Sequence, residues 1–130
     1  MGKYFDECRA FFDAKGIKYE VKDERCLAVS YSADNISSIR TLVIFDEDGE
    51  NMVSLRAYNL IKVPEDKFAK MLVAVNNANN KYKWVKFTID SELYINCEDD
   101  AILDLNSTGE EVYRLIGKIV GAAKGLFIEN

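Results

Sequence analysis

Three segments of the chain carry apolar residues at the spacing of an amphipathic helix. The first ends before Gly16, a residue that easily takes the left-handed conformation found at helix ends. The second starts near Pro64, which suits the first position of a helix. The third starts with Thr108 and Glu111 at the spacing of a capping box and runs to Gly125. The predicted apolar faces are Tyr4, Phe5, Cys8, Phe11 and Phe12; Phe68, Met71, Leu72 and Val75; and Val112, Leu115, Ile116, Ile119 and Ala123.

Between these helices apolar and polar residues alternate with the period of two that is typical of half-buried strands. The predicted strands are 17–21, 25–31, 41–45, 52–58, 84–89 and 93–97, with the third and fourth forming a hairpin at the sheet centre. Short turns between strands favour antiparallel pairing over parallel βαβ units. The sequence therefore predicts an α+β fold with an antiparallel sheet and the order α-ββββ-α-ββ-α. Because neither an internal repeat nor a flexible linker interrupts it, we expect a single domain over residues 1–130.

Two stretches of the sequence resemble a known family. Phe12, Gly16, Ile17 and Tyr19 form an opening of the type F-x-x-x-G-I-x-Y, and residues 76–87 read N-N-A-N-N-K-Y-K-W-V-K-F. Together with the order of the elements, these stretches are similar to the YbjN-like bacterial proteins, which have a type III secretion chaperone-like fold. The resemblance covers nearly the whole chain but contains no catalytic motif. It implies a mixed α+β fold, frequent dimerisation and a role as a sensory-transduction regulator, with a shape similar to that of chaperones that hold unfolded effector segments.

The charge balance narrows the choice of partners. With 22 acidic and 17 basic residues the net charge is -5, which repels the phosphates of nucleic acids and anionic membrane surfaces. No apolar run approaches the ~20 residues that span a bilayer. The charged start, with Lys3, Asp6 and Arg9, lacks the apolar stretch of a signal peptide. We therefore expect a cytoplasmic protein that binds neither nucleic acid nor membrane.

The sequence offers no catalytic or cofactor-binding motif. It contains no histidine, and so lacks the commonest general base and the nucleophile pairs that depend on it. No glycine-rich phosphate loop is present, so no cofactor is predicted and the protein is expected not to be an enzyme. The cysteines form no C-x-x-C pair. Cys8 and Cys97 are in phase with apolar residues and should be buried, whereas Cys26 is out of phase with Leu27 and is free to lie at the surface.

Two acidic clusters have simple structural interpretations. Residues 46–51 contain a glycine, but Gly49 comes too early for a calcium-binding loop, so a hairpin turn is the better interpretation. Residues 98–100 with Asp104 are expected to form a charged connection after a strand, with a weak cation site as the alternative. No metal site is predicted.

The most distinctive predicted surface is aromatic. The strand alternation places the apolar residues 85, 87 and 89 inward, and so directs Tyr82 and Trp84 to the outer face of the sheet, with Tyr94 beside them. On the preceding hairpin the same rule directs Arg56 and Tyr58 outward. Because Trp, Tyr and Arg are enriched at protein interfaces, these five residues are candidates for binding a protein partner. The equally weighted alternative is that the rings form cross-strand pairs that only stabilise the sheet.

Glycines repeat along the third predicted helix. Gly117, Gly121 and Gly125 lie on the side away from its apolar face, where another backbone could approach closely. Gly117 and Gly121 are therefore candidates for a dimer interface. The favoured alternative is that the helix tolerates these glycines because its apolar face holds it in place.

These patterns favour a non-enzymatic protein-interaction module, a homodimeric chaperone-like or regulatory adaptor that binds an extended or helical protein segment through its aromatic sheet face. The alternative is a small-molecule sensor domain with a pocket between the sheet and the helices. Such a pocket needs polar groups that point into the core, whereas the inward positions of the predicted strands are mostly apolar.

Overall fold

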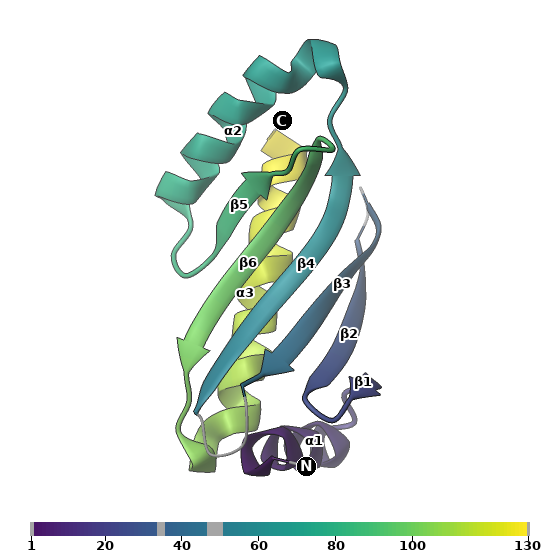
Figure 1. Cartoon of the computed structure of the whole chain (residues 1–130), viewed down its shortest axis with the longest axis vertical. Helices are drawn as coiled ribbons and strands as arrows, with labels where there is room; N and C mark the ends of the chain where they lie inside the picture. The colour runs from purple at the N-terminus through teal and green to yellow at the C-terminus, as the bar shows by residue number, and fades with distance from the viewer. Residues whose placement is uncertain (1, 34–35, 47–50, 130) are drawn as a thin grey trace.

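The computed structural model describes residues 2–33, 36–46 and 51–129, and within these ranges it contains three α-helices and six strands (Figure 1). The helices are α1 (Lys3–Lys15), α2 (Phe68–Lys81) and α3 (Thr108–Glu129). The strands are β1 (Glu20–Asp23), β2 (Cys26–Ala33), β3 (Ile36–Phe45), β4 (Met52–Lys62), β5 (Lys86–Ile89) and β6 (Tyr94–Ile102). Two short 3-10 helices, η1 (Glu65–Lys67) and η2 (Leu105–Ser107), lead directly into α2 and α3. This order confirms the predicted α+β class and the sequence α-ββββ-α-ββ-α.

All six strands pair antiparallel in one sheet, in the order β1-β2-β3-β4-β6-β5. β3 and β4 pair directly, with Val43 opposite Leu55, and lie in the middle of the sheet as predicted. The turn predicted between them falls largely on residues 47–50, which lie outside the described residues. The connection from β4 to β6 contains α2 and β5, and β5 forms the edge of the sheet beyond β6.

The helices cover one face of the sheet. α3 runs along the sheet behind β4 and β6, α1 lies across one end, and α2 flanks β5 at the other end (Figure 1). Alternate strand residues point to this face, so Val43, Leu55 and Ile95 belong to one buried cluster with Ile116 and Ile119 of α3. In the part of the chain that the structure describes, no helix covers the opposite face, which we call the outer face.

α1 is held against the start of α3 by a close approach at Gly109. A Cβ atom at this position would overlap the side chain of Phe11, so the missing side chain lets the two helices meet. Phe12, on the predicted apolar face of α1, is fully buried. Gly16 ends α1 in the left-handed conformation, with φ 71°, as predicted.

Both ends of α3 differ from the prediction. Because η2 precedes the helix, the Thr108 hydroxyl donates a hydrogen bond of 2.8 Å to the backbone oxygen of Asp104 and does not cap α3. The Glu111 carboxylate instead accepts hydrogen bonds from the Asp104 N–H, at 3.1 Å, and from the Ser107 hydroxyl, at 3.0 Å. At the other end Gly125 keeps a helical conformation, so α3 continues past it.

α2 buries only part of the predicted face, since Val75 is buried and Met71 packs against the core. The α-helix begins only after η1, and its first apolar residues, Phe68 and Leu72, are exposed. The buried residues are Ala74, Val75 and Ala78, further along the helix. Small side chains on this face let α2 lie close to β5, so the longer apolar side chains near its start remain at the surface.

The three cysteines are all buried and form no disulfide. Burial raises the pKa of Cys8 and of Cys97 to about 12, so both thiols stay protonated at neutral pH, as core residues should. Cys26 lies on the outer face of the sheet, opposite Ile44, but it is also buried, and its pKa is raised chiefly by this burial. A surface position for Cys26 is therefore wrong.

Candidate functional site

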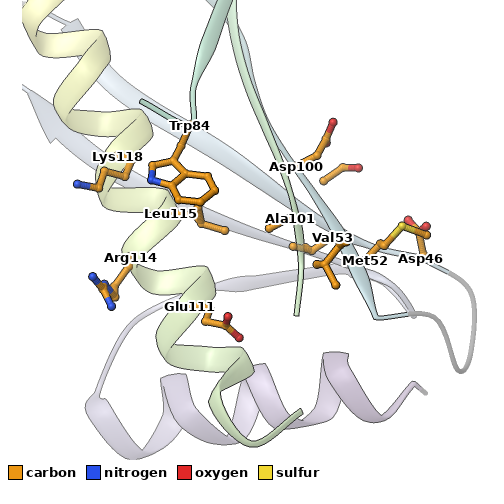
Figure 2. Close-up of a pocket in the computed structure, with 12 residues that line it drawn as sticks. Asp46, Met52, Val53, Trp84, Asp100, Ala101, Glu111, Arg114, Leu115 and Lys118 are labelled. Atoms are coloured by element: carbon orange, nitrogen blue, oxygen red, sulfur yellow. The ribbon is translucent and has the colours of Figure 1, made fainter. Parts of the chain in front are cut away.

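The connection from α2 to β5 places Trp84 away from the sheet. β5 begins at Lys86, later than predicted, and Trp84 takes a left-handed backbone conformation with φ 77°. This conformation is rare for a bulky residue, and it interrupts the strand alternation immediately before the buried Val85. The predicted position of Trp84 on the outer face is therefore wrong. Its indole lies beside α3 at the edge of the sheet (Figure 2) and is 64% exposed.

Tyr82 also lies on the helix side of the sheet. Its ring approaches Gly125 of α3 so closely that a Cβ atom there would overlap the Tyr82 hydroxyl. The Lys81 ammonium lies 5.2 Å from the centroid of the same ring. The predicted outer position of Tyr82 is thus wrong, because this ring packs against α3 and the hydrophobic core.

The other three candidate residues do lie on the outer face. Nη1 of Arg56 is 2.8 Å from the Asp100 carboxylate, and this ion pair holds the pKa of Asp100 below its usual value. The Lys62 ammonium lies 5.1 Å from the ring centroid of Tyr94, its neighbour across the strands. Tyr58 is 54% exposed, next to an irregularity in the pairing of β4 with β6. The structure therefore separates the predicted aromatic surface into two places.

A groove of about 790 Å³ lies between the edge of β6 and α3 (Figure 2). Trp84 and Leu115 stand at one side of it, and Asp46 lies beside Met52 at the other. The groove is open to solvent, since Trp84 is 64% and Ile102 is 73% exposed. Its apolar lining consists of Met52, Val53, Trp84, Ala101, Ile102 and Leu115.

The charged residues around this groove differ in how far they are neutralised. Asp100 is paired with Arg56, whereas Glu111 accepts hydrogen bonds from two neutral groups at the start of α3 and keeps its negative charge. Arg114 and Lys118 lie one turn apart on α3, and neither has an ion-pair partner among the described residues. Arg114 and Lys118 can therefore pair with carboxylates of a partner, while Glu111 and Asp46 contribute negative charge to the same groove.

Sequence reasoning missed a buried carboxyl group at Asp99. β6 continues through residues 98–100, so the predicted charged connection is wrong. The alternation turns Asp99 inward, in phase with Cys97, where it is 5% exposed and its Oδ2 has no hydrogen-bond partner. Burial raises the pKa of Asp99 to about 6. Its two acidic neighbours, Glu98 and Asp100, point to the other face, so the three carboxylates do not converge on one cation. The signal in the sequence for the burial of Asp99 was its spacing of two residues from Cys97.

The two candidate dimer residues lie on the exposed side of α3. A Cβ atom at Gly117 or Gly121 would meet nothing within 4 Å. Both glycines share a stripe of the helix with Arg114 and Lys118, so they continue the cationic side of the groove. This open space is compatible with a close helix contact, and the dimer interface stays a prediction.

These features define a class of protein. It is an α+β protein with a six-stranded antiparallel sheet that helices cover on one face, and an open groove lined by apolar and charged residues lies between β6 and α3. The chain matches the model of the YbjN family, "Putative bacterial sensory transduction regulator", over residues 5–127. It belongs to this family, as the resemblance in its sequence implies.

One solved structure with the same fold is the crystal structure of YbjN, "a putative transcription regulator from E. coli". The two chains are 11% identical, and the likeness covers 95% of this chain and 91% of that chain with a TM-score of 0.68. At this identity the likeness concerns the fold alone. No curated protein matches the sequence. None of the helices in the described residues is long and apolar enough to cross a membrane.

Proposed function

We propose that the protein is a non-enzymatic regulator or adaptor that binds a segment of another protein in the groove beside Trp84. The observation that carries this proposal is the exposure of Trp84, whose large ring lies 64% in solvent above an apolar groove. Exposed apolar surface of this kind marks interaction sites in soluble proteins. Tryptophan is also among the residue types enriched in binding hot spots. The anchoring role predicted for Trp84 thus moves from the outer face to the groove.

Two further observations support a protein as the partner. The net charge of -5 opposes binding to the phosphates of nucleic acids. The absence of histidine from the sequence removes the usual means of catalysis in such a groove. A regulatory role agrees with the description of the family, and an open groove beside a strand suits the chaperone-like holding of an unfolded segment.

Affinity capture from a bacterial lysate tests this proposal. Trp84→Ala should weaken partner binding by about 2 kcal/mol, or about thirty-fold. Tyr58→Ala is the matched control, because it removes an aromatic ring of similar exposure from the outer face, and it should leave binding unchanged. The measurement is the amount of each co-purifying protein, quantified by mass spectrometry. If every protein recovered with the wild type is recovered equally with Trp84→Ala, the groove is not the binding site.

A small-molecule sensor is the second candidate function, because the size of the groove favours it. A volume of about 790 Å³ is within the range of about 300–1,000 Å³ that is usual for ligand sites. Arg114 and Lys118 would suit an anionic group. A thermal-shift screen of small carboxylates and phosphates tests this function. A compound that stabilises the wild type but not Arg114→Ala would support it.

A further inference from the structure

β6 is longer than the strand that covers its outer edge. β5 pairs with β6 from Ile89 opposite Ile95 to Lys86 opposite Glu98. On its other side β6 pairs with β4 as far as Ile102. In the described residues no strand therefore lies beside residues 99–102 at this edge. An unpaired strand edge is a ready template for an added strand.

The hydrogen bonds at the end of β6 show which backbone groups face this edge. The N–H of Leu103 donates to the backbone oxygen of Asn51 at 2.6 Å, in register with the pair of Met52 and Ile102. In an antiparallel pair, residues that bond to the neighbouring strand alternate with residues whose N–H and C=O point away. Ile102 and Asp100 therefore direct their backbone groups away from β4, toward the open edge.

The groove coincides with this uncovered edge. It is lined by Asp100 and Ile102 from the outer side of β6, by Ala101 from its inner side, and by Trp84 and Leu115 across from them. Trp84 stands just before the start of β5, so it closes one end of the space that a longer β5 would occupy (Figure 2). The groove therefore includes the space that a further strand beside residues 99–102 would fill, and it leaves room for side chains between the sheet and α3.

We propose that an extended, acidic segment of a partner protein adds to this edge as an antiparallel strand beside residues 99–102. This inference rests on the proposed function and specifies the chemistry of the partner. The inward side chains of the segment are apolar where they meet Trp84 and Leu115, and carboxylates where they meet Arg114 and Lys118. The charge argument is local, because these two cations have no ion-pair partner among the described residues. Of the carboxylates that line the groove, Asp100 is paired with Arg56, Glu111 is engaged at the start of α3, and Asp46 lies at the far side beside Met52.

A second copy of this chain fits the edge less well. Glu98 and Asp100 project from the same side of β6, and two such edges that pair with each other bring like charges together. A segment with carboxylates on its inward side and neutral residues on its outward side avoids this repulsion.

The test uses a blocked peptide of sequence Thr-Glu-Thr-Val-Thr-Glu-Thr, which presents valine and glutamate inward and threonine outward. Trp84 is the single tryptophan of the chain, so its fluorescence reports binding in the groove directly. We expect a blue shift with this peptide and at least ten-fold weaker binding of the peptide with lysine in place of glutamate. In the exposed double variant Arg114→Glu and Lys118→Glu, the preference should reverse. Unchanged preference in that variant would overturn the charge assignment.

Methylation of peptide nitrogens tests the strand pairing itself. In the proposed antiparallel register the threonines beside the central valine donate their N–H groups to β6, while the N–H of valine points away. N-methylation of these threonines should therefore weaken binding at least ten-fold, and N-methylation of the valine should be tolerated. Equal tolerance at both positions, or the reverse order, would overturn the antiparallel strand addition.

The remaining outcomes separate this inference from the proposed function. If neither peptide binds while a lysate partner still depends on Trp84, the inference fails and the proposed function stands. If no partner depends on Trp84, the proposed function fails. Self-association that survives Gly121→Leu but disappears in the double variant would show that a second copy occupies the edge, which would also overturn the inference.

Discussion

At Trp84 the backbone angle φ of 77° removes one side chain from the alternation that Val85 and Phe87 follow. Period-two reasoning predicts the inward positions of these two residues correctly, but it assumes a regular strand up to position 84. A positive φ in a residue other than glycine leaves no mark in the composition of the segment. Trp84 was therefore identifiable as a candidate from the sequence, but its place in the structure was not.

Removing the Trp84 ring should have little effect on folding. Because this side chain is mostly exposed, Trp84→Ala should change the free energy of unfolding by about 1 kcal/mol or less. Phe87→Ala is the control, because it empties a fully buried position and should cost about 3–5 kcal/mol. Urea unfolding of both variants gives the values. A loss above about 3 kcal/mol for Trp84→Ala would show that the ring is structural.

Asp99 should make the stability of the protein depend on pH. Folding raises its pKa from 3.8 to about 6, so the folded state holds this proton more tightly than the unfolded state. Stability is therefore lost as pH rises through this window, and the loss is complete above pH 6. Asp99→Asn should stabilise the protein by about 2 kcal/mol at pH 8 and have much less effect at pH 3.5.

Urea unfolding at the two pH values measures this difference. Asp100→Asn is the control, and its effect should have the opposite sign. The contact with Arg56 lowers the pKa of Asp100, so the ionised side chain stabilises the folded state at pH values above its ordinary pKa, and Asp100→Asn should destabilise the protein there. An equal effect of Asp99→Asn at both pH values would contradict a raised pKa for the buried Asp99.

Among the helices, α3 contains glycines with two different roles. Gly109 lies under Phe11, so Gly109→Ala should separate α1 from α3 and cost about 1–3 kcal/mol. In the single chain Gly121 faces open space, so at concentrations where the protein is monomeric Gly121→Ala should stabilise the helix by up to about 1 kcal/mol. Thermal unfolding of the two variants tests the assignment. The same sign for both would show that α1 does not pack closely on α3.

The elements themselves were largely predictable. The stripe from Tyr4 to Phe12, the stop at Gly16 and the central hairpin follow from local patterns that each element satisfies by itself. The ends of the elements were harder to predict. The short 3-10 helices η1 and η2 precede α2 and α3, and so shift the first residue of each α-helix. The exposed Phe68 on α2 could not be foreseen, since the face that a helix buries depends on β5, a strand that lies later in the chain.

For the whole molecule we predict a homodimer through the glycine stripe of α3. Light scattering at micromolar concentration should give twice the chain mass of 14.8 kDa. Gly121→Leu should shift the dissociation constant upward by at least ten-fold, because a large side chain blocks close approach of the helices. Tyr58→Leu, on the outer face, is the control and should leave the dimer intact. A monomer mass for the wild type would exclude this assembly.

The groove arises from the whole fold and so lies beyond reasoning about single segments. It combines residues of β4, β6, α3 and the connection after α2, which are distant in the sequence. The sequence did indicate Trp84 as a candidate. It could not show that β5 stops short of the end of β6, because strand lengths are matched only when the sheet assembles.

Amide hydrogen exchange of the protein, free and bound to the partner that it captures, tests the binding groove most directly. Binding should slow exchange in residues 99–102 of β6 and in the segment around Arg114 and Lys118, because the partner covers this edge. Exchange in β1 and β2, the strands farthest from β6 on the other side of the sheet, should not change. Protection of β1 and β2 with no change at β6 would contradict the account and place the binding surface elsewhere.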